Sequence, residues 1–308
     1  MTAARRVLRG GLGLGACAGA GLAYSAVEAR SYRLRRVTVP VLPAGQRPLR
    51  LLHLSDLHLL PQQRKKIAWV QHLAGLEPDV VIDTGDNLAG ARSIPAVLDA
   101  LGPLLELPGA FVMGSNDYFA PTPRNPFAYF HTTGSAHDLK PGEEWKGEPL
   151  PTEDLRTGLT AAGWVDLTNA RGRLRVDGRD LELVGVDDPH INRDRYADVA
   201  GPADPSADLT LGVAHAPYQR VLDAMAHDGA GLILAGHTHG GQLRIPFSPA
   251  ALVANCDLPK SQARGLSRWG SARLHVSAGL GTSPYVRFRF ACPPEATLLT
   301  LTAQEPLG

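Results

Sequence analysis

Two histidines separated by one residue stand where this sequence could do chemistry. His237 and His239 belong to the stretch Gly-His-Thr-His-Gly-Gly, which directly follows the apolar run 232–235. In extended backbone, residues at i and i+2 project their side chains to the same side. Both imidazole rings can therefore reach one small object. Because neutral imidazole is the commonest metal ligand in proteins, the spacing predicts a metal site.

Similar side chains end other apolar runs of the chain. In open α/β sheets, sites form at the carboxyl ends of strands, so residues far apart in sequence can converge there. Each one alone also fits a turn, a helix cap or a structural histidine. Their repetition after five apolar runs favours one shared site. The candidate ligands are Asp56, His58, Asp86, Asn116, His215, His237 and His239.

The elements that must position these residues alternate between two periodicities. Short apolar runs predict buried strands, and apolar residues at helical spacing predict amphipathic helices. The predicted strands are 50–54, 79–82, 110–113, 174–176, 181–186, 209–214, 232–235, 273–277 and 296–301. The predicted helices are 65–76, 94–107, 155–162 and 218–226. This order predicts an α/β fold with a mainly parallel, buried sheet.

Composition excludes several functional classes. The chain has 308 residues, 44% of them hydrophobic, and a net charge of +1. This balance is typical of a globular protein and gives no basic surface for nucleic-acid binding. Three cysteines form no paired metal-binding motif, which excludes a thiolate zinc site. Cys256 and Cys292 either pair in an extracytoplasmic setting or remain buried free thiols.

The N-terminal segment differs from the rest of the chain. Residues 10–27 carry no charge and are flanked by arginines on both sides. This length and composition predict a membrane anchor or a signal segment, with a disordered Gly/Ala tail as the alternative. The arginines on both sides leave the orientation in the membrane open. Gly11–Ala16 fits a dinucleotide-binding pattern, but no strand precedes it, so we reject that interpretation.

The order of five short motifs resembles that of the calcineurin-like metallophosphoesterases. These motifs are Asp-Leu-His at 56–58, Gly-Asp at 85–86, Gly-Ser-Asn-Asp at 114–117, His215 and Gly-His-Thr-His at 236–239. The resemblance implies a four-layer α/β/β/α sandwich, with two central mixed sheets and helices outside. We expect an N-terminal membrane segment over 1–36, a linker over 37–48 and a metallophosphoesterase domain over 49–303. An aromatic and proline-rich insertion spans 118–152.

The resemblance also implies two divalent metal ions. By motif, Asp56, His58 and His239 would bind one ion, and Asn116, His215 and His237 the other. Asp86 would bridge the two, because a carboxylate has two oxygens that can span ions about 3.5–4 Å apart. A hydroxide between the ions would attack phosphorus. Mixed nitrogen and oxygen ligands suit Mn, Fe or Zn without choosing among them.

One motif departs from the family pattern. The family has Gly-Asn-His followed by an acid, and its histidine is thought to protonate the leaving oxygen. Aligning Asn116 with the metal-binding asparagine places Asp117 where that histidine belongs. We reject the alternative that makes Ser115 the ligand, because a neutral hydroxyl is the weaker ligand. Asp117 is then a candidate acid, or the leaving group is a stable anion that needs no acid. We favour the second hypothesis.

The N-terminal segment resembles that of the membrane-associated branch, which includes UDP-2,3-diacylglucosamine pyrophosphohydrolase-type enzymes. This resemblance suggests a phosphoester substrate linked to a lipid, with the apolar residues 246–253 and the insertion facing acyl chains. Core-packing loops are the alternative for both segments. Asp187, Asp188 and His190 either line the pocket or form a turn. A non-catalytic metal-binding module of the same fold is the competing function, supported only by the missing motif histidine. The sequence does not determine the oligomeric state.

Overall fold

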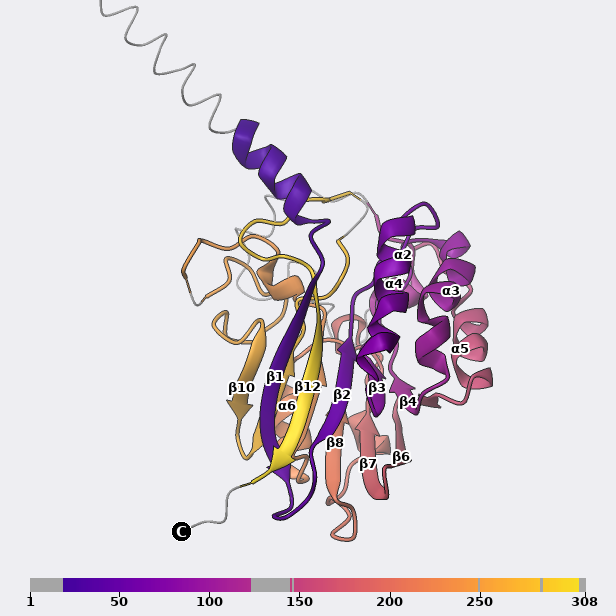
Figure 1. Cartoon of the computed structure of the whole chain (residues 1–308), viewed down its shortest axis with the longest axis vertical. Coiled ribbons are helices and arrows are strands. Elements are labelled where there is room, and N and C mark those ends of the chain that lie inside the picture. The colour runs from indigo at the N-terminus through magenta and orange to yellow at the C-terminus, as the bar shows by residue number, and fades with distance from the viewer. Residues whose placement is uncertain (1–18, 123–144, 146, 249, 283–284, 305–308) are drawn as a thin grey trace, which may run out of the picture.

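Two six-stranded sheets form the centre of the molecule (Figure 1). The computed structural model describes residues 19–122, 145, 147–248, 250–282 and 285–304. The first sheet has the order β1 (Arg33–Leu42), β12 (Glu295–Ala303), β2 (Leu49–Leu54), β3 (Val80–Asp83), β4 (Gly109–Phe111), β5 (Val165–Asp166). The second has the order β10 (Gly265–Trp269), β11 (Ala272–Val276), β9 (Leu232–Ala235), β8 (Leu209–Val213), β7 (Arg179–Gly185), β6 (Ala170–Val176).

Both sheets are mixed, as the resemblance implies. In the first, β2, β3, β4 and β5 run parallel, and β12 lies antiparallel to β2. In the second, β7, β8, β9 and β11 run parallel, with antiparallel strands β6 and β10 at the edges. The carboxyl ends of the parallel strands in each sheet therefore lie along one edge, where side chains from different strands can meet.

Helices cover the outer faces of the sheets. The α-helices are α2 (Arg64–Gln71), α3 (Ile94–Leu105), α4 (Ser115–Tyr118), α5 (Thr152–Ala161) and α6 (Gln219–His227). Short 3₁₀ helices are η1 (His72–Leu76), η2 (Ala91–Ser93), η4 (Pro189–Ile191), η5 (Tyr196–Asp198) and η6 (His239–Gly241). α2, α3 and α5 pack on the first sheet, and α6 packs on the second.

Alternation along the strands divides the core into three layers. In β2, Leu52 packs toward α2 and α3, whereas Leu51 packs between the two sheets. In β9, Ile233 packs toward α6, whereas Leu234 packs between the sheets. Successive strand residues point to opposite faces, so strands that are apolar on both faces must be covered on both faces. The expected four-layer α/β/β/α sandwich is confirmed.

The structure differs from expectation near the N-terminus. Arg33–Leu42 form β1, so residues 37–42 of the expected linker belong to the first sheet. β1 pairs only with β12 and is an edge strand, with arginines on its exposed positions. Edge strands carry charges and prolines, and Pro40 together with the arginines hides the strand pattern in the sequence. Two other short strands, β5 and β10, were also not predicted.

A helical segment over residues 19–28 precedes β1 and projects from one end of the molecule (Figure 1). Among the described residues, none of the helices combines the length and the apolar character that a membrane crossing requires. The remainder of the segment expected to meet a membrane, residues 1–18, lies outside the described residues.

The two cysteines of the folded domain do not pair. Cys256 and Cys292 are both free and buried, so the disulfide alternative is wrong and the free-thiol interpretation is confirmed.

Candidate metal centre

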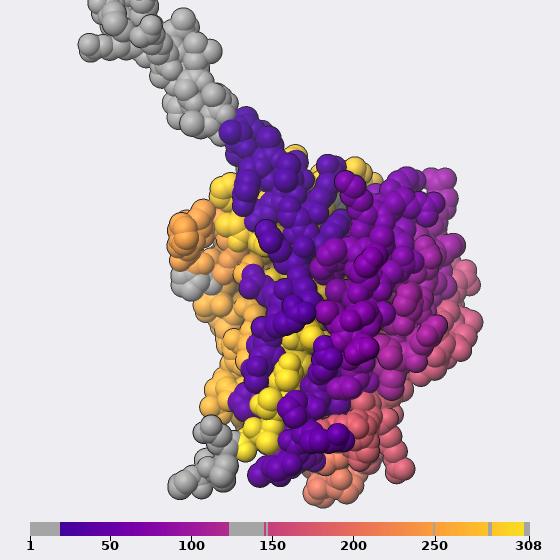
Figure 2. Space-filling model, viewed as in Figure 1, coloured from indigo at the N-terminus to yellow at the C-terminus, as the bar shows by residue number. Residues whose placement is uncertain are grey.

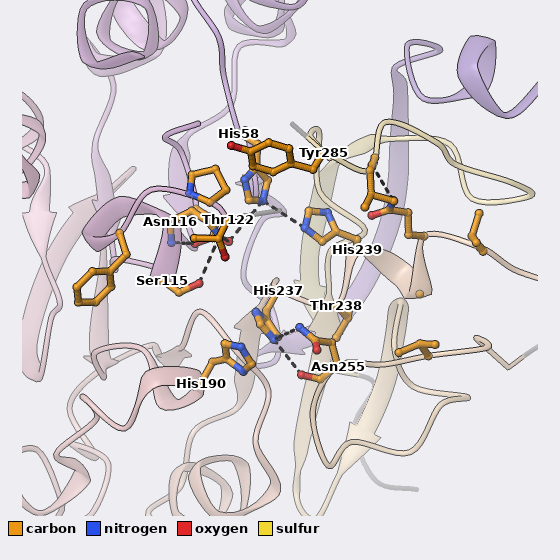
Figure 3. Close-up of a pocket in the computed structure, with 18 of the residues that line it drawn as sticks. His58, Ser115, Asn116, Thr122, His190, His237, Thr238, His239, Asn255 and Tyr285 are labelled. Carbon is orange, nitrogen blue, oxygen red and sulfur yellow. Dashed lines mark hydrogen bonds and ion pairs between the residues drawn. The ribbon is translucent and has the colours of Figure 1, made fainter. Parts of the chain in front are cut away.

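The ends of four strands, two from each sheet, bring the candidate ligands together. Asp56 follows β2 and Asp86 follows β3, whereas His215 follows β8 and His237 follows β9. A cavity of about 220 Å³ lies at this point, and side chains from both sheets point into it (Figure 3). The candidates that line this cavity are His58, Asp86, Asn116, His237 and His239. Asp56 and His215 have no exposed surface.

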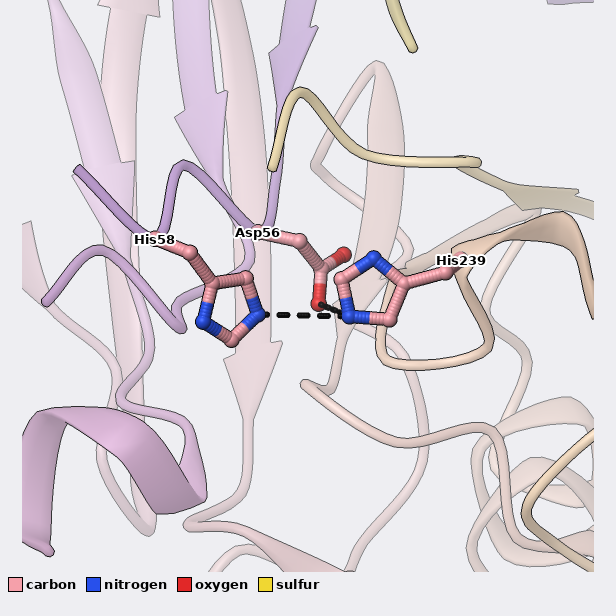
Figure 4. A group of neighbouring side chains, drawn as sticks. All are labelled: Asp56, His58 and His239. Atoms are coloured by element: carbon pink, nitrogen blue, oxygen red, sulfur yellow. Dashed lines mark hydrogen bonds and ion pairs between the residues drawn. The ribbon is translucent and has the colours of Figure 1, made fainter. Parts of the chain in front are cut away.

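The first group of ligand-type side chains is Asp56, His58 and His239, drawn in Figure 4. One ligand atom of each lies within 4.8 Å of the others. The Nε2 atoms of His58 and His239 are 3.2 Å apart, and His239 Nε2 is 3.8 Å from Asp56 Oδ1. This is the set that the family resemblance implies for one ion. Two imidazole nitrogens and a carboxylate oxygen that converge in this way suit a divalent transition metal.

The second group is Asp56, Asp86 and His215. His215 Nε2 lies 3.5 Å from Asp86 Oδ1, and His58 Nε2 lies 3.4 Å from Asp86 Oδ2. Asp86 therefore directs Oδ2 toward His58 of the first group and Oδ1 toward His215 of the second. This is the orientation that a bridging carboxylate requires.

Asn116 and His237, which the sequence also predicts as ligands, have other contacts. The backbone N–H of Asn116 donates to Asp86 Oδ1 at 2.7 Å, and its side-chain amide donates to Asp86 Oδ2 at 2.8 Å. His237 Nε2 lies 3.0 Å from the carbonyl oxygen of Asn255, and His237 belongs to neither group. Ser115 lines the cavity beside Asn116. Both predicted ligands thus border the site, and metal binding by them stays a prediction.

The protonation states of the histidines suit metal ligation. Burial lowers the pKa of His58 to about 4 and that of His237 to about 3, and it lowers the pKa of His239 as well. All three rings are therefore neutral at neutral pH, which leaves a lone pair for a metal. Such neutral rings bring nitrogen ligands into the site without adding positive charge.

His215 provides the test of whether a cation fits. Its Nδ1 donates to the carbonyl oxygen of Thr84 at 2.7 Å, which leaves the buried Nε2 without a hydrogen-bond partner. Metal-binding histidines commonly orient themselves by such a bond from the second nitrogen. Burial lowers the pKa of His215, but the carboxylates of Asp86 and Asp188 outweigh it and raise the pKa above its usual value. A positive charge at this point is therefore favoured, as metal binding requires.

The backbone of the site is held in an uncommon conformation. Five of the seven candidates have a left-handed backbone: Asp56 (φ 51°), His58 (φ 37°), Asp86 (φ 58°), His237 (φ 66°) and His239 (φ 49°). Residues other than glycine cost about 1–3 kcal/mol in such sparsely populated regions, and these cluster at functional sites. The concentration of strain on the candidate ligands supports a functional role for them.

Glycines allow the close approach of the loops that carry the carboxylates. A side chain at Gly279 would lie 2.5 Å from Asp56 Cβ, and one at Gly114 would lie 2.4 Å from Asp86 Oδ1. Both distances are well below a van der Waals contact between a Cβ atom and the neighbouring carbon or oxygen, so only glycine fits at either position. Asp56 also accepts bonds from the backbone N–H of His237 at 3.2 and 3.1 Å, which joins the two sheets at the site.

Asp117 does not occupy the position expected of an acid. Its carboxylate is fully buried, does not line the cavity and accepts four backbone N–H groups. Those donors are Gly114, Asp86, Asn87 and Leu88. Burial and the charge of Asp86 raise the pKa of Asp117 to about 7. The backbone donors act in the opposite direction, because they stabilise the ionised carboxylate and so lower its pKa. These contacts tie Asp117 to the loop of Asp86, and its role as an acid stays a prediction.

His190 and Asn255 extend the site beyond the predicted ligands. The ring of His190 lines the cavity, 4.3 Å from the ring of His237, and its Nδ1 lies 3.1 Å from the hydroxyl of Tyr218. Asp188 accepts from the backbone N–H of His190, so this segment is at once a turn and part of the cavity wall. Asn255 was missed, because nothing in the sequence marks a loop residue 18 positions after a histidine as its partner.

The insertion over 118–152 contributes apolar side chains to the cavity. Phe119 and Trp145 line it beside His58 and Asn116. The other aromatic residues of the insertion lie at 127, 129 and 130, outside the described residues. The described ends of the insertion thus border the site.

Comparison with known proteins decides the family. The model of the calcineurin-like phosphoesterase domain matches residues 49–241. The chain belongs to this family. It is accordingly a metal-dependent phosphoester hydrolase, and the family uses divalent metals at sites of this kind.

Relatives in bacteria and animals share this domain. The phosphodiesterase YaeI of Escherichia coli is 28% identical over 82% of both chains. The uncharacterised metallophosphoesterase YkoQ of Bacillus subtilis is 29% identical over 83% of this chain and 84% of its own. A transmembrane protein with a metallophosphoesterase domain from Bos taurus is 29% identical over 71% of this chain, which spans about half of that protein (47%). Among solved structures, a 5'-nucleotidase precursor from Thermus thermophilus superposes with a TM-score of 0.44 at 16% sequence identity. The superposition covers 82% of this chain and 55% of the nucleotidase chain.

We predict that Asp117→Asn lowers stability rather than removing an acid. The amide keeps one acceptor oxygen but turns an NH₂ group toward two backbone N–H donors, which should cost about 3 kcal/mol or more. Chemical denaturation measures this change, with the exposed Asp99→Asn as the matched control. Unchanged stability, together with loss of the basic limb of the pH–rate profile, would instead identify Asp117 as the acid.

Proposed function

We propose that this protein hydrolyses a phosphodiester or phosphoanhydride with the help of two divalent metal ions. The observation that carries the proposal is the position of Asp86, whose two oxygens face His58 and His215 at 3.4 and 3.5 Å. Asp56, His58 and His239 would hold one ion, and His215, His237 and Asn116 the other, with Asp86 between them. Mn, Fe or Zn fits these ligands.

The residues of the chain would fix both the ions and the substrate. When bound, the metal ions supply Lewis acidity that polarises the phosphoryl oxygens and lowers the pKa of water. His215 is oriented by Thr84 and His237 by Asn255, so neither ring has to reorganise when substrate binds. Asn116 reaches Asp86 from the cavity wall, and its amide lies where it can contact a phosphoryl oxygen.

The environment of Asp117 supports a substrate with a good leaving group. Its carboxylate is enclosed by backbone N–H groups, so it has no route to the leaving oxygen. A phosphate or nucleotide leaves as a stable anion and needs less protonation than an alkoxide does. The proposal therefore favours a phosphoanhydride or an activated diester.

The apolar wall of the cavity supports a substrate with an apolar group. Phe119, Trp145, Leu243, Leu252 and Val253 line the cavity around the polar cluster. Concave sites lined mainly by apolar side chains bury the apolar portion of their ligands. We propose a phosphoester linked to a lipid, such as a nucleotide-linked lipid or a phospholipid. The uncharged N-terminal segment would associate the enzyme with the membrane that holds it, on a side that the sequence leaves open.

Turnover of bis-p-nitrophenyl phosphate tests the activity. The full chain is needed, because β1 is part of the first sheet. After removal of metals and addition of Mn²⁺, we expect hydrolysis by the native protein and by the control Asp99→Ala, whose carboxylate is exposed. Asp86→Ala and His237→Ala should lose hydrolysis, because each removes a ligand. Folded native protein that binds Mn²⁺ but turns over no diester or anhydride would favour the non-catalytic binding module.

A leaving-group series tests the substrate class. We expect the kcat/KM of aryl phosphodiesters to fall steeply as the pKa of the leaving phenol rises, because no acid assists departure. The same series on His190→Gln tests a further imidazole on the described part of the cavity wall. Equal rates for good and poor leaving groups in the native protein would contradict the proposal and require a proton donor.

A further inference from the structure

Large apolar side chains gather at one end of the molecule. In the part of the chain that the structure describes, every large hydrophobic side chain classed as exposed lies on one of three segments, 19–28, 242–248 and 285–290. Single exposed apolar residues are common on soluble proteins, but their confinement to one region marks an interaction surface. We refer to these three segments together as the apolar end.

Direct contacts join the three segments. The backbone N–H of Arg289 donates to the carbonyl of Ser25 at 3.1 Å, and the rings of Tyr24 and Phe290 meet edge to face at 5.4 Å. Arg244 N–H donates to the carbonyl of Phe290 at 2.9 Å. Figure 2 shows the indigo helical segment beside orange and yellow segments at one end of the surface. The apolar end is therefore one continuous structure although its parts are far apart in sequence.

The most exposed side chains project from the loops and the helix. Phe247 is 105% exposed and Ile245 58%, in the loop after η6. On the helical segment, Leu22 is 60% and Val27 65% exposed. A fully exposed phenylalanine gains little from folding, and entry into an apolar phase would stabilise it.

Residues of the apolar end also line the cavity of the candidate metal centre. Gln242 and Leu243 line the cavity, as do Tyr285 and Val286. The side-chain amide of Gln242 donates to the carbonyls of Val286 and Phe288, which fixes the two rim loops to each other. Whatever contacts the apolar end therefore lies close to the cavity.

Charge indicates the nature of the contacting phase. The three segments contain Arg244, Arg287 and the buried Arg289, and Arg30 follows the first of them, whereas their one acidic residue, Glu28, is buried. Apolar side chains among cations are typical of surfaces that insert into the interface of anionic lipid bilayers. A partner protein with an apolar face would not require this one-sided charge.

We propose that the apolar end docks on the surface of an anionic lipid bilayer, with Phe247 and Ile245 inserted among the lipids and the cavity mouth opening at the interface. This inference deepens the proposed function, because it lets a lipid phosphoester enter the cavity without leaving the bilayer. It needs no membrane-spanning segment, since a peripheral surface of this kind binds by insertion to the level of the headgroups.

Fluorescence quenching by brominated lipids tests the docking directly. In the full chain, Phe247→Trp adds a tryptophan at the apolar end, and Arg175→Trp adds one on the opposite, β6–β7 side as the matched control. With vesicles of brominated phosphatidylglycerol and phosphatidylcholine, we expect quenching and a blue shift of the added emission for Phe247→Trp alone. Because the probe reports contact at position 247, attachment through residues 1–18 cannot mimic this result. No quenching at 247 would overturn the proposal.

Vesicle flotation measures the contribution of each part. We expect the double variant Ile245→Ser/Phe247→Ser to lose affinity for anionic vesicles by about tenfold or more, as loss of two inserted apolar side chains requires. Arg30→Gln/Arg287→Gln should weaken binding to anionic but not to neutral vesicles, and Arg47→Gln/Arg175→Gln should change neither. Equal flotation of all variants would overturn the proposal.

Two further outcomes separate this proposal from its alternatives. A concentration-dependent dimer that the Ile245→Ser/Phe247→Ser variant abolishes would show that the apolar end binds a second copy, and the bilayer proposal would then be wrong. Hydrolysis of bis-p-nitrophenyl phosphate, which is soluble, should be unchanged in that variant. Failure of vesicle binding with normal hydrolysis would overturn the docking alone, and vesicle binding without any hydrolysis would contradict the proposed function alone.

Discussion

The carboxylate of Asp86 is the point on which the arrangement of the site depends. One oxygen faces His58, which comes from the first sheet, and the other faces His215, which comes from the second. The two sheets must therefore pack in one register for both distances to hold, and the apolar layer between them fixes that register. Asp117, Gly114 and Asn116 all act on the loop that presents this carboxylate.

The two buried carboxylates of the site require compensation by positive charge. Asp56 and Asp86 are both buried, and burial raises the pKa of Asp56 to about 6. In contrast, contacts with His215 and His58 lower the pKa of Asp86, so that Asp86 stays ionised. Two carboxylates close together in a low-dielectric site are unfavourable unless cations compensate them. The left-handed backbone of five candidates adds further strain. A fold that keeps such a site sacrifices stability for function, as strained and charged active sites generally do.

The sequence predicted well those features that depend on local pattern. Apolar runs located β2, β3, β8 and β9, and the polar residues after them are the ones that meet around the cavity. Apolar residues repeating about every 3.6 positions located the helices α3, α5 and α6 to within a few residues. The pattern alone predicted one mainly parallel sheet, and the two-sheet architecture was implied only by the resemblance to the family.

Features that depend on long-range contacts were not predictable. β1 is an edge strand whose arginines and Pro40 resemble a linker until β12, about 260 residues away, pairs with it. Asn255 acts on His237 from a loop with no periodicity. The residue type and place of Asp117 allow either an acid or a structural role, and its four backbone donors, which favour the structural one, appear only in the folded chain.

Electron paramagnetic resonance of the protein loaded with Mn²⁺ tests the central claim most directly. If Asp86 bridges two ions, a chain with two equivalents of Mn²⁺ should give the spectrum of an exchange-coupled pair, as expected for ions about 3.5–4 Å apart. Asp86→Ala should give isolated ions or none. A native protein that binds a single Mn²⁺, with the six-line spectrum of an uncoupled ion at every metal ratio, would contradict the account.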